Sequence, residues 1–149
     1  MDSPLSQQSD QIETLRAGID VLVRVLKITD KLDLPEVGVR LSPPDTQALL
    51  FISQHPNCIS GDLANHLAVA PTTATTIVDR LVRNDLVVRE RTEANRRVVL
   101  LSLTTEGTRV IHTVLEEQRR HCQMMLEALP KDSRSSFVDN VERIASSLA

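Results

Sequence analysis

The stretch Pro71-Thr72-Thr73-Ala74-Thr75-Thr76-Ile77-Val78-Asp79-Arg80-Leu81 decides the fold of this chain. Proline is favoured in the first turn of a helix. The N–H groups there have no partner within the helix, so proline's lack of an N–H costs no hydrogen bond. Ala74, Ile77 and Leu81 recur at helical spacing and share one face, which we expect to pack inward. The pattern therefore predicts a short amphipathic helix whose outer face is rich in threonine.

Two further short helices are predicted before this one. Ser42-Pro43-Pro44-Asp45 is a helix start, because serine caps free backbone amides and an early aspartate favours the positive helix end. That helix ends at His55-Pro56-Asn57, and Ser60 begins the next one. Three short helices, with a tight connection between the last two, are typical of a helix-turn-helix.

The hydrophobic pattern changes period directly after the third helix. Residues 86–91 and 98–102 are rich in the β-branched residues that favour strands, and the polar tip 92–97 lies between them. This pattern predicts a β-hairpin, and a hairpin after a helix-turn-helix is the arrangement called a winged helix. Residues 42–102 are therefore predicted to form a winged helix-turn-helix lobe.

Long helices are predicted at both ends of the chain, over 5–33 and within 104–148, with Thr104 as a cap and Pro130 as a break. Their apolar stripes are longer than the small central lobe can cover. We expect residues 1–149 to form a single subunit, mainly α with a small β-hairpin wing, that pairs with a second copy as a homodimer. The residues expected to carry dimerisation are Ile12, Leu15, Ile19, Leu22, Phe137, Val141, Ile144 and Leu148.

Composition excludes several classes of protein. The chain has 149 residues, of which 41% are hydrophobic and 25% charged, as in a folded globular protein. Two phenylalanines with no tyrosine or tryptophan argue against a platform that stacks single-stranded bases. Two cysteines are too few for a disulfide framework, and neither a membrane span nor a secretory signal is present. The expected location is cytoplasmic.

Positive charge is concentrated in one segment. The whole chain has a formal net charge of -3. Residues 71–101 nevertheless carry six arginines against four acidic residues, while the flanking segments are acidic. A local basic footprint of this kind favours a polyanionic partner at the predicted lobe.

The order of these motifs resembles the MarR (multiple antibiotic resistance regulator) family. The matching segments are 70–81, Asp85-Leu86-Val87, Asn95-Arg96-Arg97 and Leu103-Thr104-Thr105-Glu106-Gly107. The resemblance implies a ligand-responsive repressor that binds a pseudo-palindromic double-stranded DNA operator as a homodimer, with a small-molecule effector as a further partner. It also implies that one wing arginine enters the minor groove, for which we favour Arg96, while the other steadies the hairpin. The family's wing usually has Asp where this chain has Asn95.

The candidate DNA-binding residues lie on the third helix and on the hairpin. A recognition helix places its first residues at base edges in the major groove, where a threonine offers a hydroxyl and a methyl group. Arg89 and Arg91 alternate along one strand and could contact phosphates or simply be solvated. The full set is Pro71, Thr72, Thr73, Thr75, Thr76, Arg80, Arg83, Arg89, Arg91, Asn95, Arg96 and Arg97.

Two alternatives remain open from the residues themselves. One is a helical protein-interaction dimer whose winged helix no longer binds DNA. The other is a metal-responsive regulator that uses His112, Glu116, His121 or Cys122, although adjacent residues point to different helix faces. No glycine loop or nucleophile motif is present, so we expect no enzyme, no cofactor and no metal.

Overall fold

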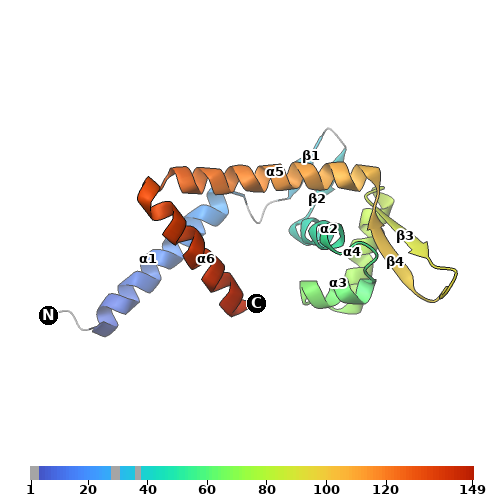
Figure 1. Ribbon diagram of the computed structural model, residues 1–149, viewed down its shortest axis with the longest axis horizontal. Coiled ribbons are helices and arrows are strands. Elements are labelled where there is room, and N and C mark those ends of the chain that lie inside the picture. Colours follow the sequence, from blue (N-terminus) through green and yellow to red (C-terminus); the bar gives the residue numbers. More distant parts are fainter. Residues whose placement is uncertain (1–3, 28–30, 36–37) are drawn as a thin grey trace. The chain divides into compact units, whose positions relative to one another are not determined.

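The computed structural model describes residues 4–27, 31–35 and 38–149. The chain is mainly helical and carries two small antiparallel hairpins (Figure 1). Its elements, in order, are α1 (Pro4–Val25), β1 (Leu32–Leu34), β2 (Val39–Leu41), α2 (Pro43–Gln54), α3 (Ser60–Leu67), α4 (Pro71–Arg83), β3 (Val87–Arg91), β4 (Val99–Leu103), α5 (Thr105–Glu127), the 3-10 turn η1 (Lys131–Ser133) and α6 (Arg134–Leu148). This order confirms the predicted fold class. Among the described residues, no helix is both long and apolar enough to span a membrane.

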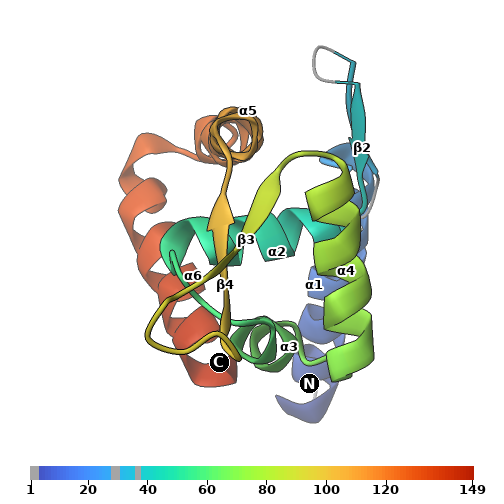
Figure 2. The same ribbon diagram turned by 90° about the vertical axis from the view of Figure 1, so that its right-hand side faces the viewer.

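The chain divides into two compact units, Met1–Ile111 and His112–Ala149, and the boundary falls within α5. The first unit holds the winged helix-turn-helix. Figure 2 shows α2, α3 and α4 crossing one another, with the β3–β4 hairpin beside them. In the second unit, α6 has no buried residue.

The core of the first unit lies where these three helices meet the base of the hairpin. Its largest fully buried side chains come from every one of these elements and include Leu49, Leu63, Leu81 and Leu101. On α4 the inward face is formed by Ala74, Ile77, Val78 and Leu81, all buried. The predicted inward face of this helix is therefore confirmed.

The turn between α3 and α4 is tight. Ala68 takes a left-handed conformation with φ of 52°, and the N–H of Val69 donates to the carbonyl of Ala64 at 3.1 Å. Pro71 then begins α4 at once. Such a left-handed residue ends a helix and turns the chain sharply, so the predicted helix-turn-helix is present.

The base of the hairpin is locked to the start of α5. β3 pairs antiparallel with β4, with Val87 opposite Leu103. The hydroxyl of Thr104 accepts a hydrogen bond from the N–H of Gly107 at 2.9 Å, which confirms Thr104 as the cap. A Cβ atom added to Gly107 would collide with the backbone carbonyl of Leu86, so only glycine fits this close approach.

The first long helix is shorter than predicted. The expectation of a helix over 5–33 is wrong at its C-terminal end, because α1 ends at Val25 and Lys27 has a left-handed φ of 51°. Residues 28–30 of that prediction lie outside the described residues. Asp33 instead belongs to β1, which pairs with β2 in a hairpin that the sequence analysis did not predict. Leu34 and Leu41 anchor this hairpin by burial.

Candidate nucleic-acid interface

The outer face of α4 carries the threonines singled out from the sequence. Pro71, Thr72, Thr73, Thr75 and Thr76 are all exposed. The hydroxyls of Thr75 and Thr76 each donate at 3.0 Å to the backbone carbonyl four residues earlier. Because these two hydroxyls already donate within the helix, they offer their lone pairs and methyl groups outward.

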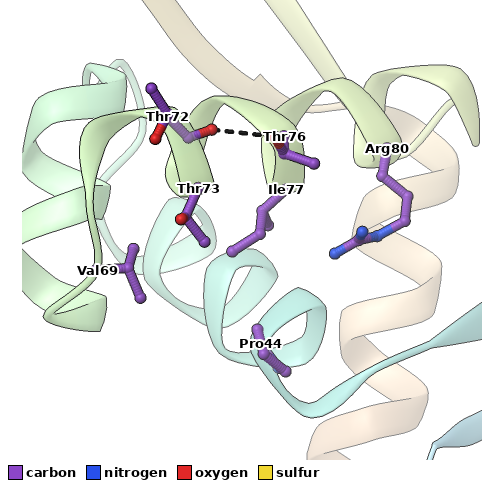
Figure 3. Close-up of a pocket in the computed structure, with 7 residues that line it drawn as sticks. All are labelled: Pro44, Val69, Thr72, Thr73, Thr76, Ile77 and Arg80. Atoms are coloured by element: carbon purple, nitrogen blue, oxygen red, sulfur yellow. Dashed lines mark hydrogen bonds between the residues drawn. The ribbon is translucent and has the colours of Figure 1, made fainter.

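A hollow of about 350 Å³ runs along one side of α4. Figure 3 shows Thr73, Ile77 and Arg80 on the side of this helix that faces Pro44 at the start of α2. Its lining is formed by Pro44, Val69, Thr72, Thr73, Thr76, Ile77 and Arg80. The lining mixes apolar side chains and hydroxyls with one guanidinium, and four of the seven predicted α4 contact residues share this surface.

Arg80 forms an ion pair that the sequence analysis did not anticipate. Its Nη2 and Nε atoms donate to Oδ1 of Asp45 at 2.6 and 2.9 Å. Asp45 is buried at the start of α2, where its Oδ2 accepts from the backbone N–H and the hydroxyl of Ser42 at 2.9 and 2.6 Å. This carboxylate joins the start of α2 to the recognition helix.

Arg89 also has a partner within the chain. Its Nη2 lies 2.5 Å from Oδ1 of Asp79, so the pair joins β3 to α4. Both side chains are well exposed, and a pair of this kind contributes about 0–1 kcal/mol. Arg83 donates at 3.4 Å to the backbone carbonyl of Asp79. Arg91 is exposed at the end of β3, opposite Val99.

The tip of the wing is organised by two uncharged side chains. The hydroxyl of Thr92 accepts from the N–H of Asn95 at 3.2 Å, and Oδ1 of Asn95 accepts from the N–H of Arg97 at 3.1 Å. Arg96 and Arg97 are exposed. Within the described ranges, no ion pair or hydrogen bond holds either guanidinium. The resemblance had assigned one of the two to steadying the hairpin, yet a backbone bond does this here.

Two of these residues were missed as site residues for physical reasons. Asp45 was interpreted only as a helix-start residue, and its partner Arg80 lies 35 positions further along the chain. Asp79 was seen only as part of the local charge balance. For Asp45 the usable signal is an aspartate directly before an apolar run, because a carboxylate that becomes buried needs a partner.

The residues proposed for a metal do not come together. Across the part of the chain that the structure describes, no group of three His, Cys, Asp or Glu side chains could hold a metal ion. Nε2 of His121 instead lies 3.1 Å from Glu117.

The two cysteines have different surroundings. Cys122 is exposed, whereas Cys58 is buried beside Leu101. Burial raises the pKa of the Cys58 thiol, and the charge of Asp62 raises it further.

The residues expected to carry dimerisation are exposed within a single chain. On α1 they are 42–63% exposed, as for Leu15 at 63%, and on α6 they range from Phe137 at 38% to Leu148 at 81%. Apolar stripes of this length are unusual on the surface of a monomer.

Comparisons with known proteins show what this lobe is similar to. Residues 41–99 match the model described as the MarR family. The transcriptional repressor Rv2887 of Mycobacterium tuberculosis, an HTH-type protein, is 29% identical over 66% of this chain and 85% of its own length.

Solved structures share the fold. A MarR family protein from Bacillus stearothermophilus matches with a TM-score of 0.77 and 24% identity, over 99% of both chains. Streptococcus pneumoniae FabT in complex with DNA matches with a TM-score of 0.71 and 17% identity, over 96% of both chains. Residues 41–99, which hold the winged helix-turn-helix, are therefore similar to the MarR family, and the whole chain shares the fold of its solved members.

Proposed function

We propose that this chain is a transcriptional regulator, acting as a repressor, that binds a pseudo-palindromic operator in double-stranded DNA as a homodimer. One observation carries the proposal: a single lobe presents both an exposed threonine face on α4 and the two unpaired arginines, Arg96 and Arg97, at the wing tip. A helix of this size fits the major groove, and arginines enter a narrow minor groove. The DNA-bound structure of FabT, which has the same fold, supports this arrangement.

The helix α4 and the wing would contact different grooves of the DNA. Residues of α4 from Pro71 to Arg83 would contact base edges, with threonine methyl groups against thymine methyls. The wing residues 92–97 would reach the flanking minor groove, and Arg91 would lie near a phosphate. Phosphate contacts fix the register of the protein on the duplex, while base contacts select the sequence.

Dimerisation would place two such lobes on one duplex. The exposed apolar residues of α1 and α6 are the surfaces that a second copy would cover. Two-fold symmetry then requires half-sites about 10 base pairs apart, or a small multiple of that distance. A small-molecule effector that bound one lobe spacing better than the other would shift the population between DNA-competent and DNA-incompetent dimers.

Selection from a random duplex library tests this function directly. We expect wild-type protein to enrich a palindrome and its affinity to fall steeply as salt rises, because phosphate contacts release counterions. The variant with Arg96→Ala and Arg97→Ala should lower the slope of log affinity against log salt by up to about 3.6 for the dimer, at about 0.9 for each of the four lost contacts.

Arg109→Ala, on α5 and outside the wing, is a control that removes one positive charge per protomer together with its ion pair to Glu106. A folded dimer, refolded free of small molecules, that enriched no sequence would refute the proposed function. It would favour the interaction-module alternative instead.

A further inference from the structure

The guanidinium of Arg80 is held along one edge by a buried carboxylate. Its Nε and Nη2 atoms both donate to Oδ1 of Asp45, at 2.9 and 2.6 Å. The side chain of Asp45 is 2% exposed, whereas that of Arg80 is 40% exposed. Releasing Arg80 would leave a buried charge without its partner, which is strongly unfavourable. Arg80 is therefore fixed in one orientation while part of it still faces solvent.

The second oxygen of the same carboxylate is also occupied. Oδ2 of Asp45 accepts hydrogen bonds from the backbone N–H and the hydroxyl of Ser42. Because Ser42 is the N-cap of α2, the carboxylate is anchored to the start of a helix and cannot follow a movement of Arg80. Asp45 is therefore held in place by Ser42 and gives Arg80 a fixed partner.

This arrangement leaves one edge of the guanidinium free. A guanidinium carries five N–H donors in a fixed, planar fork. Asp45 uses the Nε hydrogen and one Nη2 hydrogen, so the two Nη1 hydrogens and the second Nη2 hydrogen remain. These donors form the outer edge of the fork, the shape that pairs with O6 and N7 of guanine.

Arg80 lies on the proposed DNA-binding side of α4. It lines the same hollow as Thr72, Thr73 and Thr76, so it belongs to the face that carries the threonines (Figure 3). Arg89 offers a contrast, because its partner Asp79 is exposed and is not held by a second group of the kind that Ser42 provides. Only the pair at Asp45 combines a buried anchor with an arginine on this face.

We propose that Asp45 is a positioning residue that orients Arg80 to read a guanine in the major groove of each operator half-site. The inference rests on the proposed function. A phosphate contact needs only a positive charge, and a lysine can supply it. Two parallel hydrogen bonds to a base need the plane of the guanidinium to be fixed, and a buried, doubly anchored carboxylate fixes it.

The test uses the full-length protein and the duplex that wild type selects, changed one base pair at a time. Dissociation constants are measured by fluorescence anisotropy for each altered duplex. Replacing the guanine in one half-site should weaken wild-type binding by about 5- to 150-fold. Arg80→Lys keeps the charge but not the fork, so it should lose discrimination at that base pair while its pattern elsewhere and its salt slope stay unchanged.

Asp45→Asn tests the positioning role itself. The variant keeps the shape of the side chain and removes its charge, and it should weaken discrimination at the same base pair in the same direction. Ser42→Ala gives a graded comparison, because it removes one of the two bonds that anchor Oδ2 of Asp45 and leaves the backbone N–H bond in place. We expect it to lose less discrimination at that base pair than Asp45→Asn does.

Three results would overturn the inference. One is full discrimination at every guanine in Arg80→Lys, which decides the matter even if Asp45→Asn does not fold. Another is an equal loss of affinity on all duplexes in Asp45→Asn, which would make Asp45 a purely structural residue. The third is a selected duplex in which no guanine matters to wild type. If wild type selects no duplex at all, the proposed function itself has failed.

Discussion

Oδ1 of Asn95 accepts a hydrogen bond from the backbone N–H of Arg97 at 3.1 Å, at the tip of the wing. The bond shapes the turn without using a guanidinium and without adding a negative charge. Thr92 completes the turn through its hydroxyl, which accepts from the N–H of Asn95. Polar side chains that satisfy nearby backbone groups are common in such turns. The positive charges of both Arg96 and Arg97 are therefore available to a binding partner.

Asn95→Asp should weaken DNA binding through charge alone. An aspartate can accept the same backbone bond, yet it places a carboxylate beside two arginines and can pair with one of them. We expect the slope of log affinity against log salt to fall by up to about 1.8 for the dimer, at about 0.9 for one phosphate contact in each protomer. Anisotropy titrations over a salt series measure this slope.

Asn95→Ala separates charge from shape at the same position. It removes the bond to Arg97 and adds no charge, so its salt slope should stay close to wild type. An Asn95→Asp protein whose slope equals that of wild type would show that the aspartate engages neither arginine.

Gly107→Ala should destabilise the fold. The added Cβ would collide with the backbone carbonyl of Leu86, which cannot move aside as a flexible side chain could. Overpacking of this kind costs about 1–3 kcal/mol in the free energy of unfolding, and occasionally more. Urea denaturation at a fixed protomer concentration measures the loss, since the stability of a dimer depends on concentration.

Gly18→Ala is the control for this experiment. A Cβ at Gly18, within α1, meets no atom within 4 Å. Alanine is favoured over glycine inside a helix by roughly 0.5–1 kcal/mol, so this variant should be neutral or slightly more stable. Equal unfolding midpoints for Gly107→Ala and wild type would contradict the close approach at Leu86.

Local patterns predicted those parts of the molecule that depend on nearby residues. The inward face of α4 follows from the spacing of Ala74, Ile77 and Leu81, and the cap at Thr104 follows from the residues directly after it. Period and capping are local properties, so one sequence is enough to see them.

Contacts across long stretches of sequence were not predictable in this way. No periodicity links Asp45 to Arg80, because the ion pair depends on how two helices pack. The β1–β2 hairpin was missed since each strand has three residues, too few for an alternating pattern to stand out. Gly38, with φ of 66°, supplies the left-handed conformation in its turn, which glycine adopts readily.

The two thiols should differ in reactivity. Cys122 is exposed, whereas Cys58 is buried and its thiol pKa is raised by desolvation and by the charge of Asp62. Because the thiolate is the reactive form, the group with the raised pKa stays protonated to higher pH. We expect a disulfide reagent to modify one thiol per chain rapidly in native buffer, and Cys58 to react slowly because it is buried and its thiol stays protonated.

Cys122→Ser identifies which thiol reacts. This variant should show only the slow reaction, and denaturant should make Cys58 as reactive as a free thiol. Fast modification of native Cys122→Ser protein would contradict the burial of Cys58.

Ile144→Glu should convert the proposed dimer into a monomer and abolish tight operator binding. Ile144 lies in the exposed apolar stripe of α6, where a second copy would bury it, and a buried unpaired carboxylate is strongly unfavourable. Ser146→Glu is the matched control, because it adds the same charge to the same helix on its opposite, polar side. Sedimentation equilibrium should give one chain mass for Ile144→Glu and two for Ser146→Glu, and only the dimer should bind both half-sites. A dimer that survives Ile144→Glu would contradict the burial of Ile144 by a second copy.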